Sequence, residues 1–236
     1  MFSLLNNVRV SSDLEISSEL VVQTLFGILT PERQQKIEKV LQERCFDCCV
    51  VLENIYDRGN ASAVMRSQEA FGFAQTHIIE SGEKFKESQR TTAGADKWLE
   101  VTKWKNTSDC VKQLKQQGYK IAVTYLDASS KPIEQVDFSK PTALVMGNEK
   151  EGISKEMLQL ADEKVILPMV GFVQSYNISV AAALCFYQMY LDRVKRLGRS
   201  GDLNEQQKMI LKAQYTLRTL DSGLDILKQK FGDGYQ

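Results

Sequence analysis

Short apolar segments alternate with amphipathic segments through most of the chain, and this alternation limits the possible fold more than any other feature. The apolar segments have the length of buried strands, and the segments between them have the apolar spacing of helices. Such an alternation predicts an α/β fold in which helices cover a parallel sheet. We predict strands at 49–53, 75–79, 120–125, 142–146 and 164–167, and helices at 61–72, 108–117, 154–161 and 178–196.

The two ends of the chain are predicted to be helical extensions of this sheet domain. Residues 1–27 lack strong helix caps, whereas Thr30 and Pro31 form a good start for a helix that continues to Arg44. Residues 206–230 predict one or two helices that pack on their own domain, and the alternative is a helix that binds a partner. The predicted divisions are 1–47, 48–198 and 199–236.

Three polar loops follow predicted strands. The first leads into Asn60 and a helix that contains Arg66, and the second is Gly147-Asn-Glu-Lys-Glu-Gly152. The third offers the side-chain oxygens of Ser175 and Asn177 immediately before a helix that starts with small residues. Because loops at the carboxyl ends of parallel strands are the usual ligand site in open α/β sheets, we expect a ligand where these loops meet.

The composition is typical of a globular protein, with 43% hydrophobic and 25% charged residues among 236. No apolar run approaches the roughly 20 residues of a membrane span, and the N-terminus lacks a basic region followed by an apolar one. We therefore expect a cytoplasmic protein that does not bind membranes. The first strand is not followed by Gly-x-Gly-x-x-Gly and the chain has no phosphate loop, which counts against a dinucleotide site.

Cys45, Cys48 and Cys49 lie close together in the sequence and raise the question of a metal or redox site. A zinc site needs about four ligands, and the only histidine, His77, is distant in the sequence. We therefore predict buried free thiols and no metal.

The formal net charge is zero, so any contact with nucleic acid must depend on local clusters of basic residues. One cluster extends from Lys84 to Lys105 with few acidic residues, and a second lies on the helix that ends at Arg44. Such clusters can bind phosphates, although a solvated helix face explains the second cluster equally well.

The three polar loops, in this order, resemble the signature motifs of the SpoU/TrmH family, which belongs to the SPOUT superfamily of RNA methyltransferases. The resemblance extends from about Thr30 to about Arg199, and it includes a loop at Thr92 to Trp98. It implies a deep trefoil knot in the C-terminal part of the sheet domain, which is an exception to the ordinary rules of chain connection. The motifs are Glu53-Asn54 with Asn60-Ala-Ser-Ala-Val-Met-Arg66, then Gly147 to Gly152, and then Pro168 to Ala183.

The resemblance implies that S-adenosyl-L-methionine is the cofactor and that its methyl group is transferred to a ribose 2'-hydroxyl of RNA. Similarity is greatest to the members that modify guanosine-18 in the D-loop of tRNA, so the N-terminal extension is a possible tRNA contact. The residues implied to bind the cofactor are Thr124, Leu126, Met146, Gly147, Ile166, Pro168, Met169, Ser175 and Asn177.

Arg66 matches the arginine that is taken, in the family, to activate the 2'-hydroxyl. A guanidinium stays charged in proteins and is a poor base, so we favour a role in which Arg66 binds phosphate and stabilises the developing alkoxide. The alternative is an exposed helix arginine without a role. Capping of the following helices is compatible with a role of Asn60 and Asn177 in the site. The residues implied to be catalytic are Arg66, Asn60, Glu149, Ser175 and Asn177.

Contacts with RNA are expected from basic residues of the two clusters and from Arg193, for which a solvent-facing helix arginine is an equally good interpretation. The predicted contacts are Arg33, Lys36, Arg44, Arg90, Lys97 and Arg193.

Enzymes of this superfamily are typically dimers whose active site draws on both subunits. The resemblance therefore implies a homodimer through the knot region, with Phe186, Met189 and Tyr190 as candidate contacts. Three alternatives to the tRNA enzyme are a ribosomal RNA ribose methyltransferase, an RNA-binding module without activity, and a metabolic α/β enzyme. The last two are disfavoured because the motif residues are present together and in order.

Overall fold

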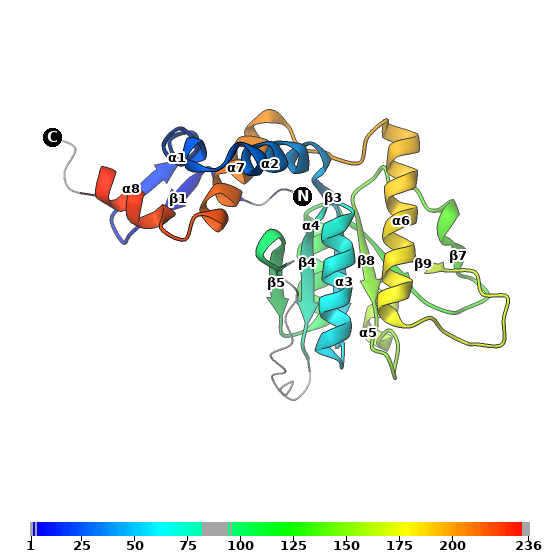
Figure 1. Cartoon of the computed structure of the whole chain (residues 1–236). Coiled ribbons are helices and arrows are strands. Elements are labelled where there is room, and N and C mark those ends of the chain that lie inside the picture. Colours follow the sequence, from blue (N-terminus) through cyan, green and yellow to red (C-terminus); the bar gives the residue numbers. More distant parts are fainter. Residues whose placement is uncertain (1, 3, 82–93, 95, 233–236) are drawn as a thin grey trace. The chain divides into compact units, whose positions relative to one another are not determined.

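The computed structural model describes residues 2, 4–81, 94 and 96–232, and the chain forms two compact units (Figure 1). One unit contains Cys45–Ser200, which is the sheet domain. The other unit combines Phe2–Arg44 with Gly201–Gln236. The two terminal extensions, which were predicted as separate parts, therefore belong to one unit.

The sheet of the first unit has seven strands in the order β5-β4-β3-β8-β6-β9-β7, and every pair of neighbours is parallel. This confirms the predicted parallel sheet flanked by helices, whereas the trefoil knot stays a prediction. β5 and β7 were not predicted, because β5 is a largely exposed edge strand and β7 has only two residues. The strands are β3 Cys45–Glu53, β4 Phe73–Ile79, β5 Glu100–Trp104, β6 Lys120–Thr124, β7 Lys131–Pro132, β8 Thr142–Met146 and β9 Glu163–Ile166.

Four helices cover the two faces of this sheet, and alternate residues of the central strand β3 show how. Val50 packs in a buried cluster with residues of α3 and α6, whereas Val51 packs in a second cluster with residues of α4 and α5. Both faces are therefore apolar, which explains why the central strands have continuous apolar sequences. The helices are α3 Arg58–Ala70, α4 Thr107–Gln116, α5 Lys155–Leu160 and α6 Ile178–Leu197, and the short 3-10 helices are Asp96–Trp98 and Ile133–Gln135.

The third-motif helix, α6, packs beside α3 with its inner face toward the sheet (Figure 1). Phe186 and Met189 are fully buried in this core, and the ring of Phe186 lies 5.9 Å from that of Phe73. The expectation that Phe186 and Met189 contact a second subunit is therefore wrong, since these side chains already pack inside their own subunit. Tyr190 is partly buried against the same cluster.

The second unit has its own apolar core, which includes Val21, Leu25, Ala213 and Leu227. The helix predicted from Pro31 is present, and the C-terminal segment forms two helices. A hairpin near the N-terminus was not predicted. The elements are β1 Asn7–Arg9, β2 Glu15–Ser17, α1 Ser18–Leu25, the 3-10 helix Phe26–Ile28, α2 Pro31–Glu43, α7 Glu205–Thr219 and α8 Gly223–Phe231.

All five cysteines are buried and free, as predicted, and burial raises the pKa of the Cys110 and Cys185 thiols to about 12. Among the residues that the structure describes, no group of three or more His, Cys, Asp or Glu side chains is arranged to hold a metal ion. Within the same residues, no helix is long and apolar enough to cross a membrane.

Candidate functional site

The three motif loops meet around one pocket of about 700 Å³ in the sheet unit. The loop after β8 lies on one side of it, and the segment that leads into α6 lies on another. The structure thus brings together most of the residues that the sequence singled out. The predicted site residues that line this pocket are Asn60, Thr124, Leu126, Met146, Gly147, Glu149, Ser175 and Asn177.

Glu149, in the second motif, holds the start of α3. Its carboxylate accepts hydrogen bonds from the backbone N–H groups of Tyr56 and Asp57, at 2.9 and 3.3 Å, and from Asn60 Nδ2 at 2.9 Å. Burial opposes ionisation of this carboxyl, but the hydrogen bonds from Asn60 and Tyr56 outweigh it and lower the pKa of Glu149. Glu149 is therefore an acceptor that orients Asn60 rather than a proton donor near neutral pH.

Asn60 also connects to the third motif. Its Oδ1 accepts a hydrogen bond of 3.4 Å from Asn177 Nδ2, and Asn177 Oδ1 caps α6 by accepting from the backbone N–H of Ser179 at 2.9 Å. The capping role and the site role of Asn177 therefore coexist in one side chain. A continuous chain of hydrogen bonds, Glu149 to Asn60 to Asn177, joins the three motifs, and we call it the motif cluster.

The loop after β8 is a tight turn, and only glycine fits at its first position, Gly147. Asn148 and Gly152 exchange two backbone hydrogen bonds of 2.9 and 2.8 Å, which close the turn. A Cβ atom on Gly147 would lie 2.5 Å from the carbonyl carbon of Gly152, so any side chain there would force the turn open. Asn148 also lines the pocket, although only its neighbours Gly147 and Glu149 were predicted to be site residues.

Three of the predicted cofactor residues do not line the pocket. Ile166 ends β9, and Pro168 and Met169 follow it in the loop that leads to α6. The two ends of this loop are held together, since Tyr176 Oη donates a hydrogen bond of 3.1 Å to the carbonyl oxygen of Pro168. Tyr176 itself lines the pocket and was missed, because a tyrosine in a loop has no distinctive sequence signal.

Arg66 is exposed and lies outside the pocket lining. It follows Asn60 by six residues on α3, so the two residues are about 9 Å apart along the helix axis and about 120° apart around it. Within one chain, the structure therefore does not bring Arg66 into the motif cluster.

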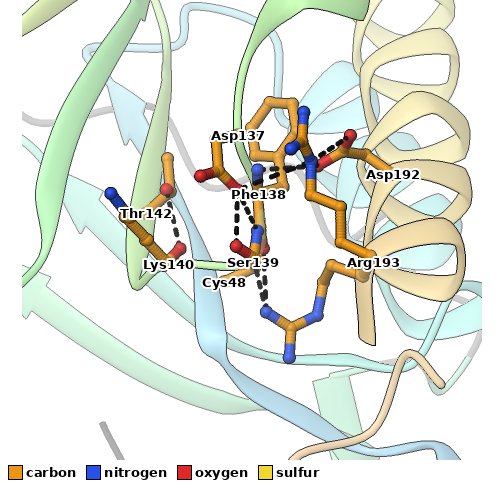
Figure 2. A network of polar contacts seen from close by, with 9 residues as sticks. Cys48, Asp137, Phe138, Ser139, Lys140, Thr142, Asp192 and Arg193 are labelled. Carbon is orange, nitrogen blue, oxygen red and sulfur yellow. Dashed lines mark hydrogen bonds and ion pairs between the residues drawn. The ribbon is translucent and has the colours of Figure 1, made fainter. Parts of the chain in front are cut away.

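Two residues predicted to contact RNA are buried instead. Arg193 is 1% exposed, and it donates to the carbonyl oxygen of Ser200 at 3.0 Å. It also donates to the carbonyl oxygen of Phe138 at 2.9 Å (Figure 2). Arg44 is also 1% exposed, with its guanidinium 5.5 Å from the centre of the Tyr215 ring. The prediction of RNA contacts is therefore wrong for both arginines, because their side chains are buried.

Three of the other predicted RNA contacts are exposed, and the fourth lies outside the described residues. Arg33 and Lys36 are exposed on α2. Lys97 is exposed as well, with its Nζ 5.7 Å from the centre of the Trp98 ring. Arg90 lies outside the described residues, as do residues 92, 93 and 95 of the loop at 92–98.

The profile of the SpoU rRNA Methylase family matches residues 47–187. A tRNA (guanosine(18)-2'-O)-methyltransferase of Borreliella burgdorferi is 36% identical over 194 residues, which are 82% of this chain and 88% of the relative. The enzyme of the same name from Escherichia coli is 33% identical over 79% of this chain and 84% of its own length.

Solved structures agree with these matches. The A. aeolicus TrmH/SpoU tRNA modifying enzyme has a TM-score of 0.68 and 33% identity, over 78% of this chain and 95% of that chain. An AdoMet-bound rRNA methyltransferase from Sinorhizobium meliloti shares the fold, with a TM-score of 0.56 and 24% identity over 66% of this chain and 59% of that chain. The chain therefore belongs to the SpoU family of methyltransferases, whose motifs its three polar loops resemble.

Proposed function

We propose that this methyltransferase transfers a methyl group from S-adenosyl-L-methionine to the ribose 2'-hydroxyl of guanosine-18 in tRNA. The observation that carries the proposal is the 36% identity to a tRNA (guanosine(18)-2'-O)-methyltransferase over 82% of this chain and 88% of the relative. We also propose that the enzyme acts in the cytoplasm, and the bacterial origin of the named relatives supports this location.

The pocket bounded by the motif loops is our candidate for the cofactor site. Its volume of about 700 Å³ lies within the usual range of roughly 300–1,000 Å³ for small-molecule sites. Gly147 supports the assignment, since the absence of a side chain lets the turn at Gly152 approach closely. Thr124, Leu126 and Met146 would hold the cofactor at the ends of β6 and β8.

When bound, the cofactor supplies a methyl group on a sulfonium, which a ribose oxygen attacks in line. The motif cluster would fix the loops so that this hydroxyl is held in position, and positioning alone can supply a large part of the rate. The hydroxyl must also lose a proton as the bond forms. Glu149 is engaged by three donors and orients Asn60, so we assign it a positioning role.

We propose that Arg66 acts on the 2'-hydroxyl electrostatically. Its guanidinium stays charged, so it stabilises a developing alkoxide and binds the neighbouring phosphate rather than accepting a proton. Arg66 is exposed on α3 and lies outside the pocket of its own chain. These positions support an active site that Arg66 of a second copy completes.

The outer face of α6 supports such a homodimer. Val180, Leu184, Tyr187, Leu191 and Val194 follow one another at intervals of four and three residues, and each is between 36% and 51% exposed. This spacing places the five side chains in one apolar stripe along the helix, which we call the α6 stripe. A second copy that covers the stripe would remove these side chains from water. Leu184→Glu should therefore yield monomers in analytical ultracentrifugation, and an unchanged dimer would exclude the stripe as the interface.

The experiment that tests the proposed activity is transfer of labelled methyl from S-adenosyl-L-methionine to a pool of tRNA transcripts, followed by mapping of ribose methylation. We expect label at a single D-loop ribose. Arg66→Ala serves as the matched variant, because it should abolish labelling while cofactor binding persists. Intact cofactor binding without any labelling of tRNA would contradict the proposal and would favour ribosomal RNA as the substrate.

A further inference from the structure

Glu53, at the end of β3, belongs to the first motif. It does not line the pocket, and it is not part of the motif cluster. Its side chain is 1% exposed. The carboxylate accepts hydrogen bonds from Thr107 Oγ1 at 2.9 Å, from Ser154 Oγ at 2.7 Å and from the backbone N–H of Ser154 at 3.0 Å. A buried carboxylate is very unfavourable unless such donors replace its hydration. The position of Glu53 and the positions of its donors are therefore strongly coupled.

Two of the three donors belong to Ser154, which stands at the junction between the second-motif loop and α5. Ser154 Oγ accepts from the backbone N–H of Met157 and caps α5, while the segment just before Ser154 lines the pocket through Gly152 and Ile153. Glu53 therefore fixes the point where the pocket-lining loop ends and a rigid helix begins.

The neighbouring residue fixes the other end of the same loop. Asn148 Nδ2 donates a hydrogen bond of 2.5 Å to the carbonyl oxygen of Asn54, and Asn148 Oδ1 accepts from the backbone N–H groups of Lys150 and Glu151 at 2.8 and 3.1 Å. Asn54 adopts a left-handed backbone conformation with a φ of 52°, in which asparagine is among the tolerated residues. Glu53 and Asn54 thus hold both ends of the loop at 148–154 from the carboxyl end of β3.

The third donor to Glu53, Thr107 Oγ1, is not connected to the loop that lines the pocket. Thr107 is the first residue of α4, which packs on the face of the sheet opposite α3 and α6. Thr107 and Ser154 therefore make equivalent hydrogen bonds to one carboxylate, but only Ser154 adjoins the pocket. This difference allows a positioning role to be separated from a purely structural one.

We infer that Glu53 is a positioning residue for cofactor binding: through Ser154 it holds the second-motif loop in the conformation that forms the pocket. The inference rests on the proposed function in one respect, namely that S-adenosyl-L-methionine occupies this pocket. Glu53 touches neither cofactor nor RNA. Its loss should weaken cofactor affinity and raise the KM for the cofactor, while the KM for tRNA stays nearly constant.

The decisive experiment compares two ways of removing donors from the same carboxylate, with isothermal titration calorimetry of S-adenosyl-L-methionine as the readout. Ser154→Ala removes one hydroxyl donor and the cap of α5. The double variant Asn106→Ala with Thr107→Val removes one hydroxyl donor and the cap of α4, because Asn106 Oδ1 accepts from the backbone N–H of Asp109. The two variants lose the same kinds of hydrogen bond at the starts of two helices that pack on the same face of the sheet.

We expect Ser154→Ala to weaken cofactor binding about fivefold and Glu53→Gln about tenfold, with the α4 double variant within about twofold of wild type. Urea unfolding of each variant measures the accompanying loss of stability. Equal weakening by Ser154→Ala and by the α4 double variant, or no weakening in either, would overturn the inference even if Glu53→Gln fails to fold.

A separate variant tests the site itself. Leu126 is 61% exposed and lines the pocket, so Leu126→Arg should block cofactor binding without disturbing the core. Wild-type affinity in Leu126→Arg would place the cofactor elsewhere and would overturn the proposed site, and the role of Glu53 with it. Blocked binding in Leu126→Arg with unchanged binding in Ser154→Ala would overturn the role of Glu53 alone.

Discussion

The two ends of α6 both carry polar clusters, but these clusters differ in burial and in what they can do. At the N-terminal end, Asn177 is exposed and joins Asn60 and Glu149 beside the pocket. Toward the C-terminal end, Arg193 is 1% exposed and Asp192 is 6% exposed, and both bind backbone groups of Phe138 (Figure 2). Polar side chains on one helix can thus serve a ligand site at one end and the packing of a loop at the other.

Arg66 and Arg193 show the same difference between an exposed and a buried polar side chain. Arg66 and Arg193 each lie on a helix of a family motif, and the sequence predicted a functional contact for both. Arg66 is exposed, whereas Arg193 satisfies the carbonyl oxygens of Phe138 and Ser200 inside the unit. We therefore expect substitution of Arg66 to impair activity and substitution of Arg193 to impair stability.

The largest effect is expected for Arg66→Ala. Loss of one group that stabilises charge in the transition state typically lowers kcat about 100- to 1,000-fold. The unfolding transition in urea should coincide with that of wild type, because Arg66 is exposed. Single-turnover methylation of tRNA measures the effect, and Arg199→Ala is the control for removal of an exposed arginine. An Arg66→Ala enzyme with wild-type kcat would remove Arg66 from the mechanism.

Arg193→Ala should produce the largest loss of stability. The substitution leaves the carbonyl oxygens of Phe138 and Ser200 without this donor, and breaking such buried charged contacts costs about 3 kcal/mol. Urea denaturation gives the free energy of unfolding. At temperatures where the variant is folded, its affinity for S-adenosyl-L-methionine should stay within about twofold of wild type. Strongly reduced affinity with normal stability would show that the C-terminal end of α6 serves the site.

Glu149→Gln tests the motif cluster through its dependence on pH. The folded-state pKa of Glu149 lies below its ordinary value of 4.5, so its contribution to stability is present above pH 4.5 and is lost as the pH falls through the lowered value. We expect Glu149→Gln to be less stable than wild type by at most about 1 kcal/mol at pH 7, because the side chain is exposed. This difference should shrink below pH 4.5 in urea titrations. A difference that grows with acidity would contradict the assignment.

The smallest effect is expected for Arg196→Ala, which serves as the control for Arg193. Arg196 Nε donates to Asp192 at 2.8 Å, but its side chain is 43% exposed, so water can replace the contact. The unfolding midpoint in urea should shift much less than in Arg193→Ala. A shift of similar size in both variants would mean that the ion pairs of Asp192, rather than burial of Arg193, stabilise this end of α6.

Sequence patterns predicted the central strands of the sheet. Helices cover these strands on both faces, so the strands need continuous apolar residues. The strand predicted at 142–146 is β8, Thr142–Met146. Patterns failed for β5, whose central residues Val101, Thr102 and Lys103 are exposed at the sheet edge and show no apolar run. They also missed the hairpin of β1 and β2, whose strands have only three residues each.

The site was predictable to the extent that parallel strands place their following loops at one edge. Asn60, Glu149 and Asn177 meet there as expected. The burial of Arg193 was not predictable, because it depends on Phe138 and Ser200, whose positions the sequence around α6 does not indicate. The role inferred for Glu53 depends in the same way on Thr107 and Ser154, which are distant in sequence.

The central claim, methylation of one ribose in tRNA, is tested most directly with two transcripts that differ by a single oxygen atom. One carries guanosine at position 18 and the other carries 2'-deoxyguanosine at the same position. With labelled S-adenosyl-L-methionine, the account predicts about one methyl group per molecule of the first transcript and none in the second. Equal labelling of both transcripts would contradict it.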